Sequence, residues 1–223
     1  MEYQKVINRL KLLANPKNVE GMARFGIVGK NVLGVSIVEL RKIAKEIGKN
    51  HELALKLWDS EIHEAMILAS MVDVSELVTE KQVEKWVREF ESWDICDQVL
   101  NNLFKKTKFA WGKATEWSKR EKVFEKRAGF VIMAVLAVYD KKRNDKDFEK
   151  FLPLIKKASI DERNFIKKAV NWALRQIGKR SKYLNKKAII AAKEIQKLDS
   201  KFAKWVANDA LRELTSEPIK RRL

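Results

Sequence analysis

The stretch SWDICDQV, residues 92–99, places a tryptophan and two carboxylates beside apolar residues in a strongly basic chain. Trp93 and Asp97 are four positions apart, so on a helix they share one face. A carboxylate on such a face either pairs with a neighbouring lysine or arginine, or faces a group that favours a negative charge. Asp94 has a simpler explanation. With Ser92 as N-cap it lies in the first helical turn, where it favours the positive end of the helix dipole.

Two further segments combine basic and aromatic residues at helical spacing. FEKRAGFVIMAVL contains Lys126 and Arg127 before a long apolar run. NFIKKAVNWALRQIGKR carries Trp172 three residues before Arg175 and one turn after Lys168.

Structural roles are the alternative for each of these residues. A tryptophan at helical spacing usually belongs to the core. Arg127 is a candidate ion-pair partner for Asp97, and the basic run at 141–143 is typical of a solvated face. Taken singly, none of the three segments outweighs its structural explanation. Taken together, on three separate helices of a basic protein, they indicate a binding site.

The segments that carry these residues have the pattern of helices. There are only 8 Gly and 3 Pro, and apolar positions recur at intervals of three and four rather than two. Ser36 and Glu39 form a capping box before one such segment, and Gly48 is expected to end it. Similar signals predict helices from Thr79 with Gln82 through Phe90, from Ser118 with Glu121 to about Tyr139, and from Asp161 to about Gly178.

The predicted helices favour an all-α repeat fold. About a dozen helices and no strand are expected, and short connections make consecutive helices pack as antiparallel pairs. Pairs recurring at roughly 35 to 45 residues favour a HEAT-like α-solenoid, with a compact helical bundle as the alternative. No linker is visible, so one domain spanning 1–223 is expected. In a solenoid one helix of each pair lines a concave surface, where residues distant in sequence converge.

The charge of the chain favours a polyanionic partner. It contains 47 Lys and Arg against 30 Asp and Glu, a formal net charge of +17. Nucleic acid that binds such a surface releases counterions, and this release favours association. A lysine-rich surface that is merely solvated is the alternative.

The chain lacks the residues for several other kinds of site. Its one cysteine, Cys96, excludes an intrachain disulfide, and its two histidines, His51 and His63, supply no metal-ligand cluster. We therefore expect no metal and no cofactor. The N-terminus lacks a signal-peptide core, and the longest apolar run, roughly residues 130–138, is too short to span a bilayer. A soluble intracellular protein without a membrane partner, most simply cytoplasmic, is expected.

Four segments together resemble the AlkD-type alkylpurine DNA glycosylases, a family of HEAT-like DNA alkylation repair enzymes. NPKNVEGMARFGIVGKNVLGVSIVELRKIAKEI is similar to the N-terminal signature of that family, and WDICDQV to its Trp-x-x-x-Asp element. EKRAGFV resembles the helix with its Arg-Ala pair, and FIKKAVNWALRQIGK resembles its Lys-Ala-x-x-Trp-x-Leu-Arg helix. Residues 105–122 do not closely match the family's pattern.

The resemblance implies a curved array of about six HEAT-like helix pairs that holds duplex DNA in a concave basic groove. It also implies hydrolytic excision of N3- or N7-alkylated purines, without flipping the damaged base into a pocket. The catalytic aspartate of the family maps onto Asp97, and its two sugar-cradling tryptophans map onto Trp93 and Trp172. Its DNA-contacting arginine maps onto Arg127, and Arg175 matches a further basic position.

These residue types suit that reaction. An N3- or N7-alkylpurine already carries positive charge, so it leaves without a general acid. A fixed carboxylate stabilises the oxocarbenium-like sugar that forms, and it can orient the attacking water. The indole faces attract the cationic sugar and base, while Arg127 and Arg175 hold phosphates. The neighbouring Lys126 and Lys168 complete the expected DNA contacts.

Two other functions use the same helical scaffold. A non-catalytic binder of distorted or branched DNA would need no carboxylate at the site, so Asp97 favours the enzyme over the binder. A protein-interaction solenoid would show no salt-sensitive DNA affinity. We expect a monomer, because neither the fold nor the groove calls for an oligomer. The residues do not distinguish N3 from N7 lesions, or adenine from guanine.

Overall fold

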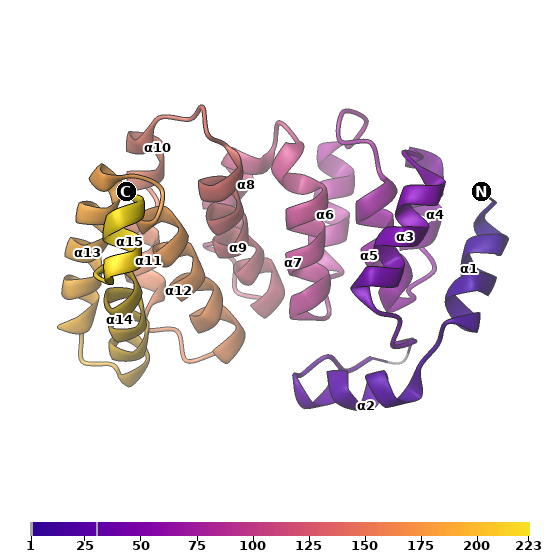
Figure 1. Ribbon diagram of the computed structural model, residues 1–223, viewed down its shortest axis with the longest axis horizontal. Helices are drawn as coiled ribbons and strands as arrows, with labels where there is room; N and C mark the ends of the chain where they lie inside the picture. The colour runs from indigo at the N-terminus through magenta and orange to yellow at the C-terminus, as the bar shows by residue number, and fades with distance from the viewer. Residues whose placement is uncertain (1, 30) are drawn as a thin grey trace. The chain divides into compact units, whose positions relative to one another are not determined.

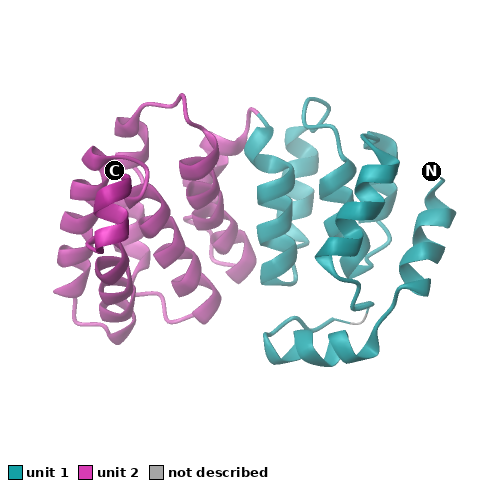
Figure 2. Cartoon of the chain, viewed as in Figure 1, with its two compact units in different colours: residues 1–107 teal, residues 108–223 magenta. Residues whose placement is uncertain are grey.

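The computed structural model describes residues 2–29 and 31–223, and these residues form α-helices and one short 3₁₀ helix with no strand among them (Figure 1). The predicted all-α class is confirmed. None of the helices in this part of the chain has the length and apolar character needed to cross a bilayer. The chain divides into two compact units, residues 1–107 and 108–223 (Figure 2). A single domain over the whole chain stays a prediction.

Unit 1 is built from helices that pack in sequence around stacked aromatic rings. Helix α5 contacts α3, α4 and α7. The buried indoles of Trp58 and Trp86 stack with their centroids 4.0 Å apart, which joins α4 to α6. The elements are α1 (Tyr3–Leu12), α2 (Pro16–Arg24), α3 (Ile37–Ile47), α4 (His51–Trp58), α5 (His63–Val72), α6 (Glu80–Arg88), α7 (Trp93–Asn102) and the 3₁₀ helix η1 (Phe104–Lys106).

Local capping signals correctly located two helix starts in unit 1. The Ser36 side chain accepts a hydrogen bond from the backbone N–H of Glu39, and α3 ends at Gly48, whose φ of 73° suits glycine. Thr79 caps α6 in the same way. Helix α6 ends at Arg88 rather than at the predicted Phe90, because the chain turns there and buries the Phe90 ring against Trp58.

Unit 2 is built around two long helices that pack against each other, α9 and α12. Helix α9 spans 17 residues, and most of its side chains are buried. A wholly apolar middle of this kind is typical of a helix covered on all sides. The elements are α8 (Ala110–Trp117), α9 (Val123–Tyr139), α10 (Asp145–Glu149), α11 (Leu152–Ala158), α12 (Asn164–Gly178), α13 (Lys182–Gln196), α14 (Lys201–Leu214) and α15 (Glu217–Arg222).

Two predicted helix starts in unit 2 are wrong. Ser118 follows the end of α8, and its hydroxyl donates back to the Thr115 carbonyl at 2.9 Å, so it does not cap α9. Asp161 precedes α12 by three residues, and its carboxylate accepts from the Arg163 backbone N–H at 3.1 Å. In both places the polar side chain holds a turn instead of opening a helix. The predicted ends at about Tyr139 and Gly178 are correct.

Contacts between successive parallel helices reveal the repeat. In unit 1, α5 meets α7 through His63 with Asp94 and through Ser70 with Asn102, pairs that are 31 and 32 positions apart. In unit 2, side-chain hydrogen bonds link α12 to α14 at separations of 34 and 35 positions. In each pair of helices, a residue later in the first helix contacts a residue later in the second, so the two helices run parallel. These separations lie at or just below the lower end of the predicted range of roughly 35 to 45 residues. Two hydrogen bonds that join α9 to α12 and to the turn after it span 38 and 43 positions, which lie within that range.

Candidate functional site

Helix α7 carries the two residues that open the predicted site. It begins at Trp93, with buried Ser92 at the N-cap position. Its core face consists of Ile95, Cys96, Val99 and Leu100. Trp93 and Asp97 are both partly exposed, four positions apart, and so lie on the same side of α7 away from that core. The predicted shared face is therefore present within unit 1.

The Trp93 indole is held against the segment that follows α2. Its Nε1–H donates to the Phe25 carbonyl oxygen at 3.0 Å. Residue Phe25 itself is 73% exposed. The N-terminal motif MARF and the motif WDICDQV therefore meet in space, although Phe25 and Trp93 are 68 positions apart. This contact fixes the orientation of the Trp93 side chain at the surface. The sequence pattern did not predict the contact.

Asp94 joins the first turns of α5 and α7. Its carboxylate contacts His63 Nε2 at 2.7 Å and accepts a hydrogen bond from the Ser92 hydroxyl at 2.7 Å. Burial alone would raise the pKa of Asp94, but the hydrogen bonds from His63 and Ser92 hold it below its ordinary value. Asp94 therefore lies in the first turn of α7, as predicted, and in addition links α7 to α5. Ser92 occupies the predicted N-cap position, but its hydroxyl bonds to Asp94 instead of the backbone.

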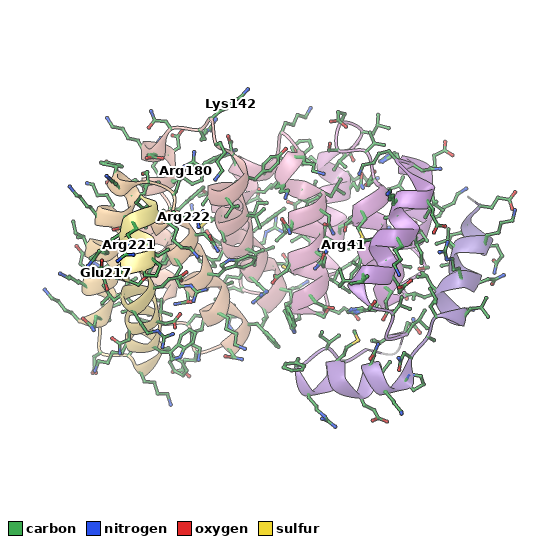
Figure 3. All side chains as sticks on the ribbon, in the orientation of Figure 1. Arg41, Lys142, Arg180, Glu217, Arg221 and Arg222 are labelled. Carbon is green, nitrogen blue, oxygen red and sulfur yellow. The ribbon has the colours of Figure 1, made fainter. Side chains whose placement is uncertain are left out.

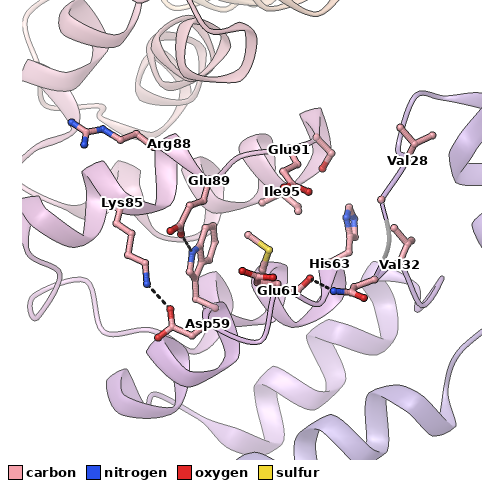
Figure 4. A pocket seen from close by; sticks show the side chains of 15 residues that line it. Val28, Val32, Asp59, Glu61, His63, Lys85, Arg88, Glu89, Glu91 and Ile95 are labelled. Carbon is pink, nitrogen blue, oxygen red and sulfur yellow. Dashed lines mark hydrogen bonds and ion pairs between the residues drawn. The ribbon is translucent and has the colours of Figure 1, made fainter.

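A cavity of about 640 Å³ lies beside the start of α7 in unit 1 (Figure 4). Ser92 and Ile95 of α7 line it, whereas Trp93 and Asp97 do not. Several of its polar groups already bond to protein groups. Lys85 contacts Asp59, and the Trp58 indole donates to Glu89 at 2.6 Å. The cavity therefore offers no set of groups aimed at one class of ligand, and no pattern in the sequence indicated it.

Lys126 and Arg127 of α9 bond to the segment where α12 begins. Arg127 is 5% exposed, and its Nη1 donates to the Phe165 carbonyl oxygen at 2.6 Å. Lys126 Nζ lies 3.1 Å from the Asp161 carboxylate. Both basic groups thus help to join α9 to α12. The phosphate contact expected of Arg127 stays a prediction, and its burial favours a role in positioning α12.

The Asp161 carboxylate is the centre of this junction. Arg163 and Lys126 both bond to it, and only 10% of its side chain is exposed. Burial alone would raise the pKa of Asp161, but the hydrogen bonds from Arg163 and Lys126 lower it to about 2. Asp161 is therefore ionised at any pH at which the protein would act on nucleic acid.

Helix α12 presents Lys168, Trp172 and Arg175 at intervals of four and three residues. Lys168 is exposed and Trp172 partly exposed. Arg175 donates a hydrogen bond to Asp209 at 2.9 Å and forms an ion pair with Glu213 at 2.8 Å, so its charge is already neutralised by α14. A phosphate at Arg175 would have to compete with two carboxylates. Lys168 is the basic residue of this row that is most accessible to a ligand.

The structure brings the predicted residues together in two groups. Trp93 and Asp97 share α7 in unit 1, while the other five lie in unit 2 on the packed helices α9 and α12. A site that combines both groups stays a prediction. Within residues 2–29 and 31–223, no cluster of His, Cys, Asp and Glu is arranged to hold a metal ion. The basic run at 141–143 is exposed as predicted, and Lys142 points away from the helices (Figure 3).

The chain is similar in sequence to a known protein family and to two bacterial proteins. The model of a family described as DNA alkylation repair enzyme matches residues 6–214. An uncharacterised protein of Listeria innocua is 26% identical over 206 residues, covering 91% of this chain and 90% of its own length. An uncharacterised protein of Listeria monocytogenes is 26% identical over 200 residues, covering 88% and 87% respectively.

One solved structure has the same fold. It superposes with a TM-score of 0.78 at 21% identity, over 96% of this chain and 95% of the other. That protein is described as one of a new family related to the HEAT-like repeat DNA glycosylases, with affinity for branched DNA structures. The predicted HEAT-like helical-repeat fold is confirmed by this similarity.

Proposed function

Because this chain belongs to the family of DNA alkylation repair enzymes, we propose that it is a DNA glycosylase acting on N3- or N7-alkylated purines in duplex DNA. The observation that carries the proposal is the position of Asp97. It is a carboxylate on the partly exposed side of α7, one turn after Trp93, in a chain with a net charge of +17. A negative group there suits a substrate that becomes positive during the reaction.

Asp97 would act on the sugar and not on the base. The alkylated purine is cationic and leaves as a neutral base when its glycosidic bond breaks. The deoxyribose then carries the positive charge, which a fixed carboxylate stabilises by about 3–4 kcal/mol in comparable sites. Asp97 would also orient the water that attacks the sugar. No second acid is required, since the leaving group needs no proton.

The other predicted residues would bind the DNA around the sugar carbon from which the damaged base leaves. The indoles of Trp93 and Trp172 would pack against the cationic sugar, each contributing roughly 0.5–2 kcal/mol. Lys168, which is exposed on α12, would contact a phosphate. Arg127, Lys126 and Arg175 would support that surface, because each already bonds to protein groups. The damaged base would not enter a pocket, and a monomer would suffice.

Base release tests this function. Purified protein is incubated with duplex DNA that has been treated with a methylating agent, and the free bases are separated by chromatography. We expect 7-methylguanine or 3-methyladenine to appear with time, and no base to be released from untreated DNA of the same sequence. Absence of both bases at a protein concentration that saturates the DNA would rule out the glycosylase.

A second candidate is a non-catalytic binder of branched DNA. The solved structure with the same fold favours it, because affinity for branched DNA is attributed to that protein. Such a binder would show higher affinity for a four-way junction than for a duplex of equal length, without base release. Asp97 argues against it, since a carboxylate weakens binding to phosphates unless it has another role.

A further inference from the structure

The seam between α12 and α14 carries a second aromatic and basic surface in unit 2. The two helices run parallel and pack against each other (Figure 1). Each presents a solvent-accessible row at intervals of three or four residues: Lys168, Trp172 and Arg175 on α12, and Lys201, Trp205 and Asn208 on α14. The row on α14 thus repeats the Lys-x-x-x-Trp pattern of α12 on the next parallel helix.

Trp205 is the centre of this surface. It is the most exposed tryptophan among the described residues, with 41% of its surface accessible. Lys167 Nζ lies 4.5 Å from the centroid of the Trp205 ring and 5.7 Å from that of Phe202. Lys201 Nζ lies 5.1 Å from the centroid of Phe202. An exposed indole bordered by ammonium groups presents a π-face and positive charge within one small area.

The charge around Trp205 is not neutralised by the protein. Lys167 lies over the Trp205 ring, Lys204 directly precedes Trp205 in the chain, and Lys168 and Lys201 are exposed on the same two helices. In the described part of the chain no carboxylate forms an ion pair with any of these four lysines. The nearest acidic residue along α14, Asp209, is already bonded by Arg175 and Arg212. The four lysines are therefore available to an anion outside the protein.

We propose that Trp205 and these four lysines bind an unpaired nucleotide of a DNA strand. The base would stack on the exposed part of the indole, and the lysines would contact the phosphates on either side. Every base has a π-face, so the contact would be tolerant of sequence. Paired bases inside a duplex are already stacked on each other and cannot use the indole. This proposal rests on the proposed function, in which the protein binds DNA. It adds a contact for a single-stranded segment that adjoins the duplex.

The test compares two DNA molecules with the same duplex sequence. One has blunt ends and the other carries a single-stranded arm, and binding of each labelled DNA is followed by fluorescence anisotropy. Wild type should bind the armed DNA more tightly. Trp205→Ala should weaken binding of the armed DNA about tenfold and of the blunt duplex less than about twofold. Trp205→Phe, which keeps an aromatic face, should retain most of the wild-type preference.

Tyr183 provides a matched control. It is also 41% exposed and has Lys187 Nζ 5.6 Å from its ring centroid, but it lies on α13 and its hydroxyl bonds to Glu149. Tyr183→Ala should leave binding of both DNA molecules unchanged. Circular dichroism of each variant would establish that it is folded.

Three results would overturn the proposal. If Trp205→Ala binds the armed DNA as wild type does, while duplex binding and base release persist, this surface has no such role and the proposed function stands. If wild type binds neither DNA, both the surface and the proposed function fail. If an acidic peptide displaces the armed DNA as effectively as single-stranded DNA of equal charge, the lysines bind anions without using the indole.

Discussion

At the scale of single residues, two largely buried carboxylates, Asp94 and Asp161, join one helix to another. Asp94 binds His63 and so links α5 to α7, next to Trp93 of the predicted site. Asp161 binds Lys126 of α9 and Arg163, just before α12. In both cases the pKa of the carboxyl is lowered because the charged form receives hydrogen bonds that offset its burial. Such carboxylates stabilise the protein in a pH-dependent manner.

Asp161 gives a measurable linkage between pH and stability. Its pKa is about 2 in the folded protein, below the ordinary value of 3.8. Its stabilisation is therefore fully present above the unfolded pKa and is lost as the pH falls from about 4 toward 2. We expect Asp161→Asn to lower the free energy of unfolding by about 1–2 kcal/mol at pH 7. Urea unfolding should show this difference shrinking at pH 3. A difference that stays constant between those pH values would contradict the assigned pKa.

Asp147 is a suitable control for this measurement. Its carboxylate also pairs with basic side chains, Arg143 and Lys150, but on the surface of α10. Solvent weakens such pairs. Asp147→Asn should therefore change the free energy of unfolding much less than Asp161→Asn does.

At the scale of elements, close backbone approach determines how the helices of unit 2 pack. Gly129 lies in the buried stretch of α9 against the end of α8. A Cβ atom at Gly129 would lie 2.2 Å from the Ser118 backbone nitrogen and 2.6 Å from the Ser118 Cα. Neither backbone atom can move aside as a flexible side chain would. This glycine therefore permits the contact between α8 and α9.

Gly129→Ala tests this packing against a control in the neighbouring helix. We expect it to lower the free energy of unfolding by about 2–3 kcal/mol, since the helices must separate. A Cβ atom at Gly112 in α8 would meet nothing within 4 Å outside its own helix, so Gly112→Ala should stabilise the protein by about 0.5–1 kcal/mol. Chemical denaturation of both variants gives the comparison. Equal effects of the two substitutions would show that α8 and α9 do not approach each other this closely.

The helix boundaries show which features of the fold the sequence can and cannot predict. The caps at Ser36 and Thr79 were predicted correctly because a cap involves residues only three apart. Ser118 has the same local pattern, but its hydroxyl bonds back into α8. Only the packing of α8 on α9 decides between these two arrangements. Helix type is thus a local property, whereas this helix boundary depends on tertiary contacts.

Pairings between residues far apart in the sequence could not be predicted either, because they also depend on tertiary contacts. The Trp93–Asp97 spacing predicted one shared face, and the structure has it. Nothing in that spacing indicates that His63 binds Asp94, since 31 positions separate them. Likewise, Arg175 was expected to hold a phosphate because its type and position suited that role. Its bonds to two carboxylates of α14 appear only once the register of the two helices is known.

At the scale of the whole molecule, net charge is the dominant feature. The formal charge of +17 remains after many lysines and arginines pair with carboxylates, as Lys126 and Arg175 do. Pairing within the protein removes some basic groups from the surface that DNA can contact. The unpaired lysines, such as Lys168, are therefore the ones expected to release counterions from bound DNA.

DNA affinity should consequently fall steeply with salt. If four or more phosphates are contacted, the equilibrium constant for an undamaged duplex should drop about a hundredfold or more between about 50 and 200 mM salt. Titrations by fluorescence anisotropy at several salt concentrations measure this slope. A change of less than about threefold over the same interval would point to a partner other than nucleic acid.

The most direct test of the account concerns the Asp97 carboxylate. The rate of 7-methylguanine release is measured under single-turnover conditions for wild type, Asp97→Asn and Glu91→Gln, with duplex binding measured in parallel. Glu91 is an exposed carboxylate just before α7, so its variant removes an equal charge nearby. We predict that Asp97→Asn binds the duplex as tightly as wild type but excises about 10²–10³ times more slowly, while Glu91→Gln excises at the wild-type rate. Excision by Asp97→Asn at the wild-type rate would contradict the proposed role of Asp97.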